Sequence, residues 1–111
     1  MSLKIERINS SMQKEISYII ANEVKNPHVK YVTITAVEVT NDLSYARVYF
    51  TTVRDRKETL RGLISAKGYI KHELGERIEL RSIPELEFIY DDSIEYANSI
   101  EEKIKEIHNK N

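Results

Sequence analysis

Apolar residues recur at steps of three and four over the first part of the chain. They are Ile5, Ile8, Met12, Ile16, Ile19, Ile20 and Val24. This spacing places them along one side of an amphipathic helix of about twenty residues that ends before Pro27. The pattern then changes, because residues 32–39 are rich in β-branched side chains and their apolar phase shifts near Ala36. That segment predicts a strand with a bulge or with burial on both faces.

Alternation predicts two further strands. Residues 41–44 have the composition of a turn, and residues 45–50 then alternate between apolar and polar or amphipathic side chains. Together with the first strand they predict an antiparallel hairpin with one buried face. Pro84 cannot occupy a central strand, and apolar residues alternate over residues 86–90 behind it. A third strand is therefore expected to begin after the proline.

Two helical patterns lie between the second and third strands. Asp55, with Glu58 three residues later, is typical of a helix N-terminal cap. The buried stripe expected behind this cap consists of Leu60, Leu63 and Ile64. Ala66-Lys67-Gly68 then predicts a hinge, because small residues weaken a helix, and a second helix follows. Backbone N–H groups exposed at such a hinge, beside Lys67, would attract phosphate.

The end of the chain predicts a last helix, capped by Asp92 or Ser93. Its apolar side consists of Ile94, Ala97, Ile100, Ile104 and Ile107. The expected fold is therefore α+β, with the order α-β-β-α-α-β followed by a C-terminal helix. No repeat or linker interrupts it, so we expect a single domain over residues 1–111, with a three-stranded sheet covered by helices on one face.

Composition narrows the class of protein. The chain has 111 residues, 41% of them apolar, which suffices for one core, and it has no cysteine for disulfides or thiolate metal ligands. No apolar run indicates a signal peptide or membrane span, so a cytoplasmic protein is expected. The net charge of −1 conceals an uneven distribution: residues 44–81 carry nine basic and five acidic side chains, and residues 82–111 carry three and eight. The central stretch could meet an anion, although ordinary solvated faces would give the same count.

The sequence offers little for catalysis. His28, His72 and His108 lack the spacing of a metal site, and no nucleophile elbow, phosphate-binding loop or dinucleotide fingerprint is present. We therefore expect no enzyme activity, no metal ion and no cofactor.

Several motifs in order resemble one family, ribosome-binding factor A. They are the hairpin 32–49, the segment Ala66-Lys67-Gly68, residues 73–88 and residues 92–96. The resemblance implies a type II KH-like fold in which an Ala-x-Gly helix kink, formed here by Ala66 and Gly68, replaces the usual Gly-x-x-G loop. It also implies a cytoplasmic bacterial factor that binds the free small (30S) ribosomal subunit during late maturation of 16S rRNA and matters most in the cold.

The resemblance and the charge pattern together suggest the RNA contacts. Lys67 and Lys71, one turn apart, are expected to bind rRNA phosphates, with Arg54, Arg61 and Arg81 nearby on the same basic face. Asn26-Pro27-His28 stands where the family usually has Asp-Pro-Arg, which weakens any cationic contact from that loop. We expect a monomer that acts without catalysis. Two alternatives remain open, a protein-interaction module and a generic single-stranded RNA-binding domain.

Overall fold

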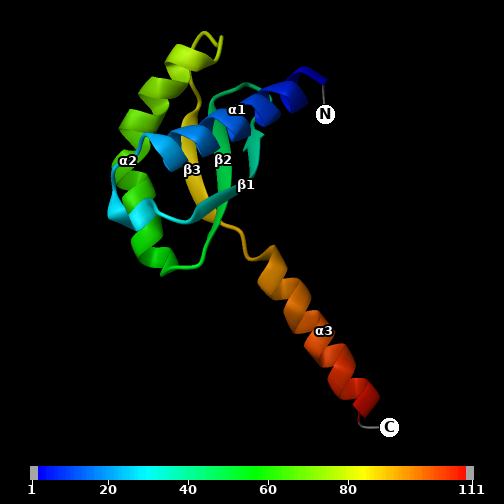
Figure 1. Cartoon of the computed structure of the whole chain (residues 1–111). Helices are drawn as coiled ribbons and strands as arrows, with labels where there is room; N and C mark the ends of the chain where they lie inside the picture. Colours follow the sequence, from blue (N-terminus) through cyan, green and yellow to red (C-terminus); the bar gives the residue numbers. More distant parts are fainter. Residues whose placement is uncertain (1–2, 110–111) are drawn as a thin grey trace.

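The computed structural model describes residues 3–109, with side chains described through residue 104. In chain order the elements are α1 (Leu3–Asn22), the short 3-10 helix η1 (Pro27–Val29), β1 (Val32–Val39), β2 (Tyr45–Thr52), α2 (Arg56–Arg77), β3 (Glu85–Tyr90) and α3 (Ser93–Asn109). Figure 1 shows their arrangement. The predicted α+β class is confirmed, as are the first helix, all three strands and the start of the last helix.

The three strands form one mixed sheet in the order β1-β2-β3. β1 and β2 pair antiparallel, and the register shifts between Ile34 and Ala36, which confirms the predicted bulge. β3 pairs parallel to β2, so α2 is the crossover between them. At the hairpin turn the Asp42 carboxylate accepts hydrogen bonds from Ser44 and Thr40, which lower the pKa of Asp42 to about 2.

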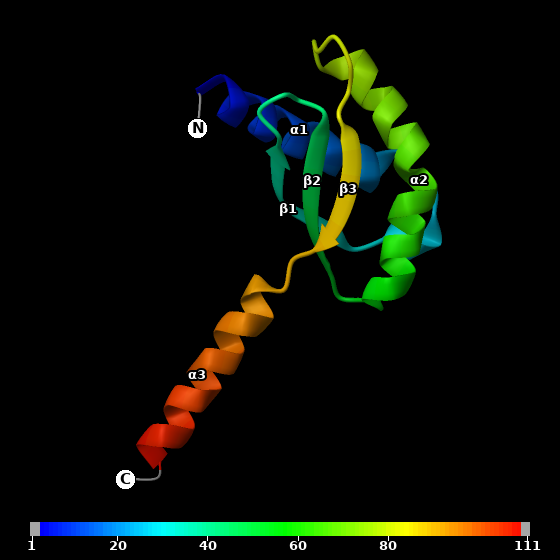
Figure 2. The same cartoon turned by 180° about the vertical axis from the view of Figure 1, so that it is seen from behind.

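One face of the sheet carries the core. α1 crosses this face and α2 lies beside it along β3, whereas Figure 2 shows the opposite face of the sheet without a covering helix. The core contains the alternate strand residues expected from the sequence, including Ala46, Val48 and Phe50, which are fully buried. Tyr45 and Arg47, which alternate with these residues along β2, are exposed on the open face. The prediction of helices on one face of the sheet is thus confirmed.

The helix between β2 and β3 is continuous, so the predicted division into two helices is wrong. α2 runs through Ala66-Lys67-Gly68 without interruption, and its ribbon curves but does not break (Figure 2). None of the described glycines has a positive φ. A glycine inside a helix costs only about 1 kcal/mol relative to alanine. Burial of Ala66, Ile70 and Leu74 along one side of α2 offsets that cost, since all three pack into the core.

The N-terminal half of α2 packs on η1. The Asp55 cap is confirmed, because its carboxylate accepts a 2.9 Å hydrogen bond from the Glu58 N–H. Ile64, however, is 53% exposed, because it does not lie on the side of α2 that faces the core. Gly62 lies on that inner side, and a Cβ added there would stand 3.0 Å from side-chain atoms of His28 and Val29. The missing side chain at Gly62 therefore allows η1 to approach the helix.

α3 projects away from the rest of the molecule in both ribbon views (Figures 1 and 2). Its start is held by Asp91, which accepts hydrogen bonds from the Ser93 N–H and the Thr35 hydroxyl. The large residues on its apolar side are 41–69% exposed; they are Ile94, Tyr96, Ile100 and Ile104. Ile107, predicted for the same side, lies outside the residues whose side chains are described. Over the described chain, no helix combines the length and the apolar character needed to cross a bilayer.

Candidate nucleic-acid interface

The five cations predicted to bind RNA do not form one patch. Arg54 precedes α2 and Arg81 follows it, and a helix of 22 residues is about 33 Å long. Lys67 and Lys71 lie between them, one turn apart. The expectation of a single basic face beside a broken helix is therefore wrong, because α2 is one continuous helix that is long enough to separate its two ends. Whether each of the five contacts RNA stays a prediction.

Lys67 and Lys71 share one carboxylate. Their ammonium groups lie 3.6 Å and 3.1 Å from the two oxygens of Glu85, at the start of β3. The hydrogen bond from Lys71, followed by the charges of both lysines, holds the pKa of Glu85 below its usual value. These two lysines are thus partly neutralised within the molecule. An RNA phosphate would have to compete with Glu85 for them.

The three predicted arginines differ in their surroundings. The Arg54 guanidinium lies 5.0 Å from the centre of the Tyr31 ring, and Arg61 pairs with Glu58 at 3.3 Å. Arg81 makes no ion pair with any described residue. Only Arg81 among the three is therefore free of a charged or aromatic partner in the described part of the chain.

Arg77, at the end of α2, has a structural role. Its guanidinium pairs with Glu15 and Glu73, each at 3.6 Å, and with Glu23, to which it donates a short hydrogen bond. It also lies 5.2 Å from the centre of the Tyr18 ring. Arg77 thereby joins α1 to the C-terminal end of α2. Three carboxylates around one guanidinium leave this corner acidic.

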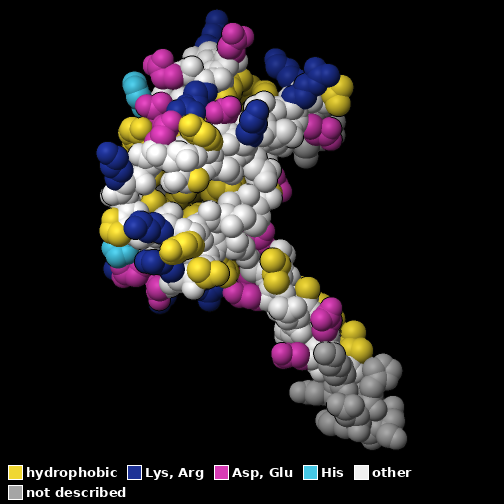
Figure 3. Space-filling model, viewed as in Figure 1, with side chains coloured by type: hydrophobic (Ala, Val, Ile, Leu, Met, Phe, Trp, Pro, Cys, Tyr) yellow, Lys and Arg dark blue, Asp and Glu magenta, His cyan; other side chains and the backbone are white. Residues whose placement is uncertain are grey.

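Cations without ion-pair partners are found on α1. Lys4, Arg7 and Lys14 pair with no described acidic residue, and with Ser11 they recur at steps of three, four and three. We call these four residues the α1 stripe; they lie on one side of the helix. Figure 3 shows Lys and Arg side chains gathered near the N-terminal end of α1. Sequence reasoning missed the stripe because it counted charge by segment, although the spacing was available as a signal.

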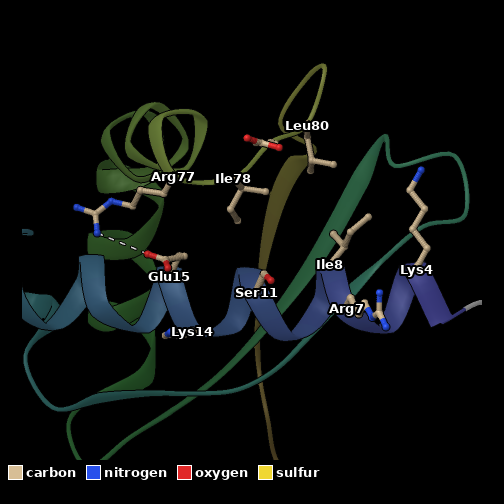
Figure 4. Close-up of a pocket in the computed structure, with 10 residues that line it drawn as sticks. Lys4, Arg7, Ile8, Ser11, Lys14, Glu15, Arg77, Ile78 and Leu80 are labelled. Atoms are coloured by element: carbon tan, nitrogen blue, oxygen red, sulfur yellow. Dashed lines mark ion pairs between the residues drawn. The ribbon is translucent and has the colours of Figure 1, made fainter.

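The α1 stripe borders a groove between α1 and the segment that follows α2. A cavity of about 440 Å³ is lined by all four stripe residues and by Ile8, Glu15, Arg77, Ile78, Glu79 and Leu80. Figure 4 shows Ile8 and Ser11 on α1 facing Ile78 and Leu80 across this space. Over the residues with described side chains, no three His, Asp or Glu groups converge to hold a metal ion. The groove offers cations, two carboxylates and apolar surface.

Comparison with known sequences decides the family. The profile described as "Ribosome-binding factor A" matches residues 4–104. The chain belongs to the ribosome-binding factor A family. Ribosome-binding factor A of Staphylococcus carnosus is 50% identical over 97% of this chain and 96% of its own length. The same family member from Macrococcus caseolyticus is 50% identical over 97% of both chains.

Solved structures of ribosome-binding factor A share the fold. The crystal structure from Thermus thermophilus has a TM-score of 0.74 and 24% identity, covering 78% of this chain and 93% of its own. A homology model of the Thermus thermophilus protein, fitted into a cryo-EM map of its 30S complex, has a TM-score of 0.66 and 25% identity over 76% of this chain and 91% of its own. These neighbours agree with the KH-like fold that the resemblance to the family implied.

Proposed function

We propose that this protein is a ribosome assembly factor that binds the small ribosomal subunit in the cytoplasm and assists late maturation of 16S rRNA. The observation that carries the proposal is the family match over residues 4–104. The 30S complex of the Thermus relative supports the small subunit as the partner. Maturation is assisted by binding alone, with no bond made or broken by the protein.

Binding can assist assembly by shifting an equilibrium between rRNA conformers. A factor favours one conformer only by as much as it binds that conformer more tightly. In this proposal the cations supply the attraction to phosphate. The two packed helices α1 and α2, which we call the helix pair, supply the shape that fits the RNA. Lys67 and Lys71 contact phosphates at the middle of α2. Arg54 and Arg61 near one end of the helix and Arg81 beyond the other end contact separate parts of the RNA.

Co-sedimentation tests the proposal directly. The full chain is mixed with mature small subunits, precursor small subunits, large subunits and a short single-stranded RNA oligomer. We expect it to sediment with small subunits and to bind the oligomer at least tenfold more weakly. Equal binding to the oligomer would instead make it a generic RNA-binding domain. Absence from every small-subunit pellet would contradict the proposed function.

A protein-interaction role is the second candidate, and α3 is the observation that favours it. Its large apolar residues are 41–69% exposed, which is unusual for an amphipathic helix in a small domain. A chain shortened after Asp92 separates the two roles. Assembly-factor binding through the helix pair predicts that the shortened chain still sediments with small subunits, whereas a role centred on α3 predicts that it does not.

A further inference from the structure

We propose that the α1 stripe, Lys4, Arg7, Ser11 and Lys14, is a second RNA-binding surface that holds the sugar-phosphate backbone of rRNA. The inference rests on the proposed function and adds a site that the predicted cations of α2 do not include. It concerns the backbone rather than base edges, so it contributes affinity and orientation without reading sequence.

The stripe cations are available to bind an anion. The Lys67 and Lys71 ammonium groups already face Glu85, whereas the three stripe cations have no ion-pair partner among the described residues. A phosphate can therefore reach the stripe cations without first displacing an ion-paired carboxylate. An exposed lysine or arginine loses conformational entropy when its side chain is held in one position. A charge-assisted hydrogen bond to an anionic partner offsets that loss.

The stripe residues are aligned in a row along α1. Positions 4 to 14 span about 15 Å along a helix axis, and the steps of three and four keep the side chains in one row. A row of cations with a hydroxyl between them matches a linear chain of phosphates better than a cluster would. Ser11 can donate to a phosphate oxygen between Arg7 and Lys14. The stripe thus has the shape of a track for a nucleic-acid strand.

The groove beside the stripe also fits a nucleic-acid strand. The cavity beside the stripe is lined on its α1 side by the stripe cations and Ile8, and on the facing side by the apolar residues Ile78 and Leu80 (Figure 4). Phosphates can meet the cations while the sugar carbons pass over apolar surface. Glu15 and Glu79 also line the groove, and the carboxylates around Arg77 close it at one end. The strand therefore follows the row from Lys14 toward Lys4 and does not continue past Arg77.

Paired double variants test the inference. In Arg7→Ala/Lys14→Ala two stripe cations are removed. In the control, Lys25→Ala/Lys30→Ala, two exposed cations outside the stripe are removed, so the net charge is the same. We expect the stripe variant to bind small subunits at least tenfold more weakly at low salt. The slope of log affinity against log salt should flatten by roughly 1.5, because each lost phosphate contact changes it by roughly 0.7 to 0.9.

The outcomes separate the two proposals. Failure of the wild-type chain to bind small subunits would overturn the proposed function and the inference with it. Wild-type binding with equal losses in both double variants would overturn only the inference, because general attraction would then explain the effect. Thermal unfolding of both variants within about 2 °C of wild type is expected, since none of the four cations makes a described ion pair.

Cross-linking identifies what the stripe touches. The chain has no cysteine, so Ser11→Cys provides a single point for attaching a short photo-reactive group. Asn41→Cys, at the hairpin turn, is the matched control. On small subunits we expect the Ser11 position to cross-link to 16S rRNA and the Asn41 position to do so at least tenfold less. Cross-links from Ser11 to a ribosomal protein alone, or none at all, would overturn the inference.

Discussion

α1 and α2 both present cations, yet they use them differently. On α2, Lys67 and Lys71 face Glu85, Arg61 faces Glu58, and Arg77 binds three glutamates. On α1 the stripe cations make no ion pair with a described carboxylate, although Glu15 and Glu79 line the same groove. The central segment contains more basic residues than the first, but much of its charge is neutralised inside the molecule. The number of cations in a segment is therefore a poor measure of how strongly it attracts RNA.

The largest effect should come from Arg77→Ala. Removing the guanidinium leaves Glu15, Glu23 and Glu73 close together, and their repulsion separates α1 from α2. We expect the melting temperature to fall by roughly 5–10 °C in thermal unfolding. Arg7→Ala is the control and should change it by less than about 2 °C. If both variants unfold alike, the division into structural and free cations is wrong.

Lys67→Ala/Lys71→Ala should weaken binding less than the stripe variant does. Each lysine must leave Glu85 to reach a phosphate, so part of the attraction is already offset. We expect a loss of about threefold to tenfold and a flattening of the salt slope by roughly 1, measured by co-sedimentation over a salt series. A loss larger than that of Arg7→Ala/Lys14→Ala would reverse the comparison and make α2 the main RNA-binding surface.

Gly68→Ala tests whether α2 is functionally one helix. A Cβ at Gly68 meets no atom within 4 Å, so alanine should raise the free energy of unfolding by about 0.5–1 kcal/mol through helix propensity alone. Gly62→Ala is the control, and contact with η1 should cancel that gain. Denaturant titration measures both. Destabilisation by Gly68→Ala would show that the helix requires a break at this position.

Glu85→Gln should convert paired lysines into free ones. Without the carboxylate, Lys67 and Lys71 meet phosphates unopposed, and we expect affinity for small subunits to rise about twofold to threefold. Glu101→Gln replaces an exposed acid of α3 that makes no described ion pair, so it gives the same change in net charge and controls for it. An unchanged affinity in Glu85→Gln would mean that RNA does not reach these lysines.

The same pair gives the smallest effect, in the pH dependence of stability. Because the folded-state pKa of Glu85 is lowered, its ionisation stabilises the fold above the unfolded value near 4.5, and this contribution is lost as pH falls through the lower folded value. The wild type should therefore melt slightly above Glu85→Gln at neutral pH, and the difference should disappear as pH falls below the unfolded value of 4.5 and through the lower folded value. A difference that persists in acid would assign it to packing.

Local patterns predicted most of the fold. The period of α1, the bulge near Ala36, the Asp55 cap and the strand after Pro84 all depend on neighbours in sequence, and each is present. The predicted break at Gly68 was wrong, because the cost of a glycine inside a helix is smaller than the free energy gained when Ala66, Ile70 and Leu74 pack into the core. Ile64 was placed in the core for a similar reason, since one turn of a helix does not fix which side faces inward.

The candidate site was less predictable. The pairing of Lys71 with Glu85 joins residues 14 positions apart across a strand boundary, and no spacing rule indicates it. The row from Lys4 to Lys14 was visible in the sequence, but its freedom from partners could be known only from the folded structure. The apolar stripe of α3 was visible in the sequence, whereas its exposure could be known only from the folded structure.

The parallel pairing of β3 with β2 has a consequence for synthesis of the chain. The β1–β2 hairpin closes over a short turn, but β3 reaches its place only after the whole of α2 has formed. A nascent chain that has not yet emerged as far as residue 90 therefore presents an open β2 edge beside unfilled apolar positions. A stalled or truncated product would aggregate first through such an edge. Pairing of β3 with β2 therefore completes the sheet as the last step of its co-translational folding.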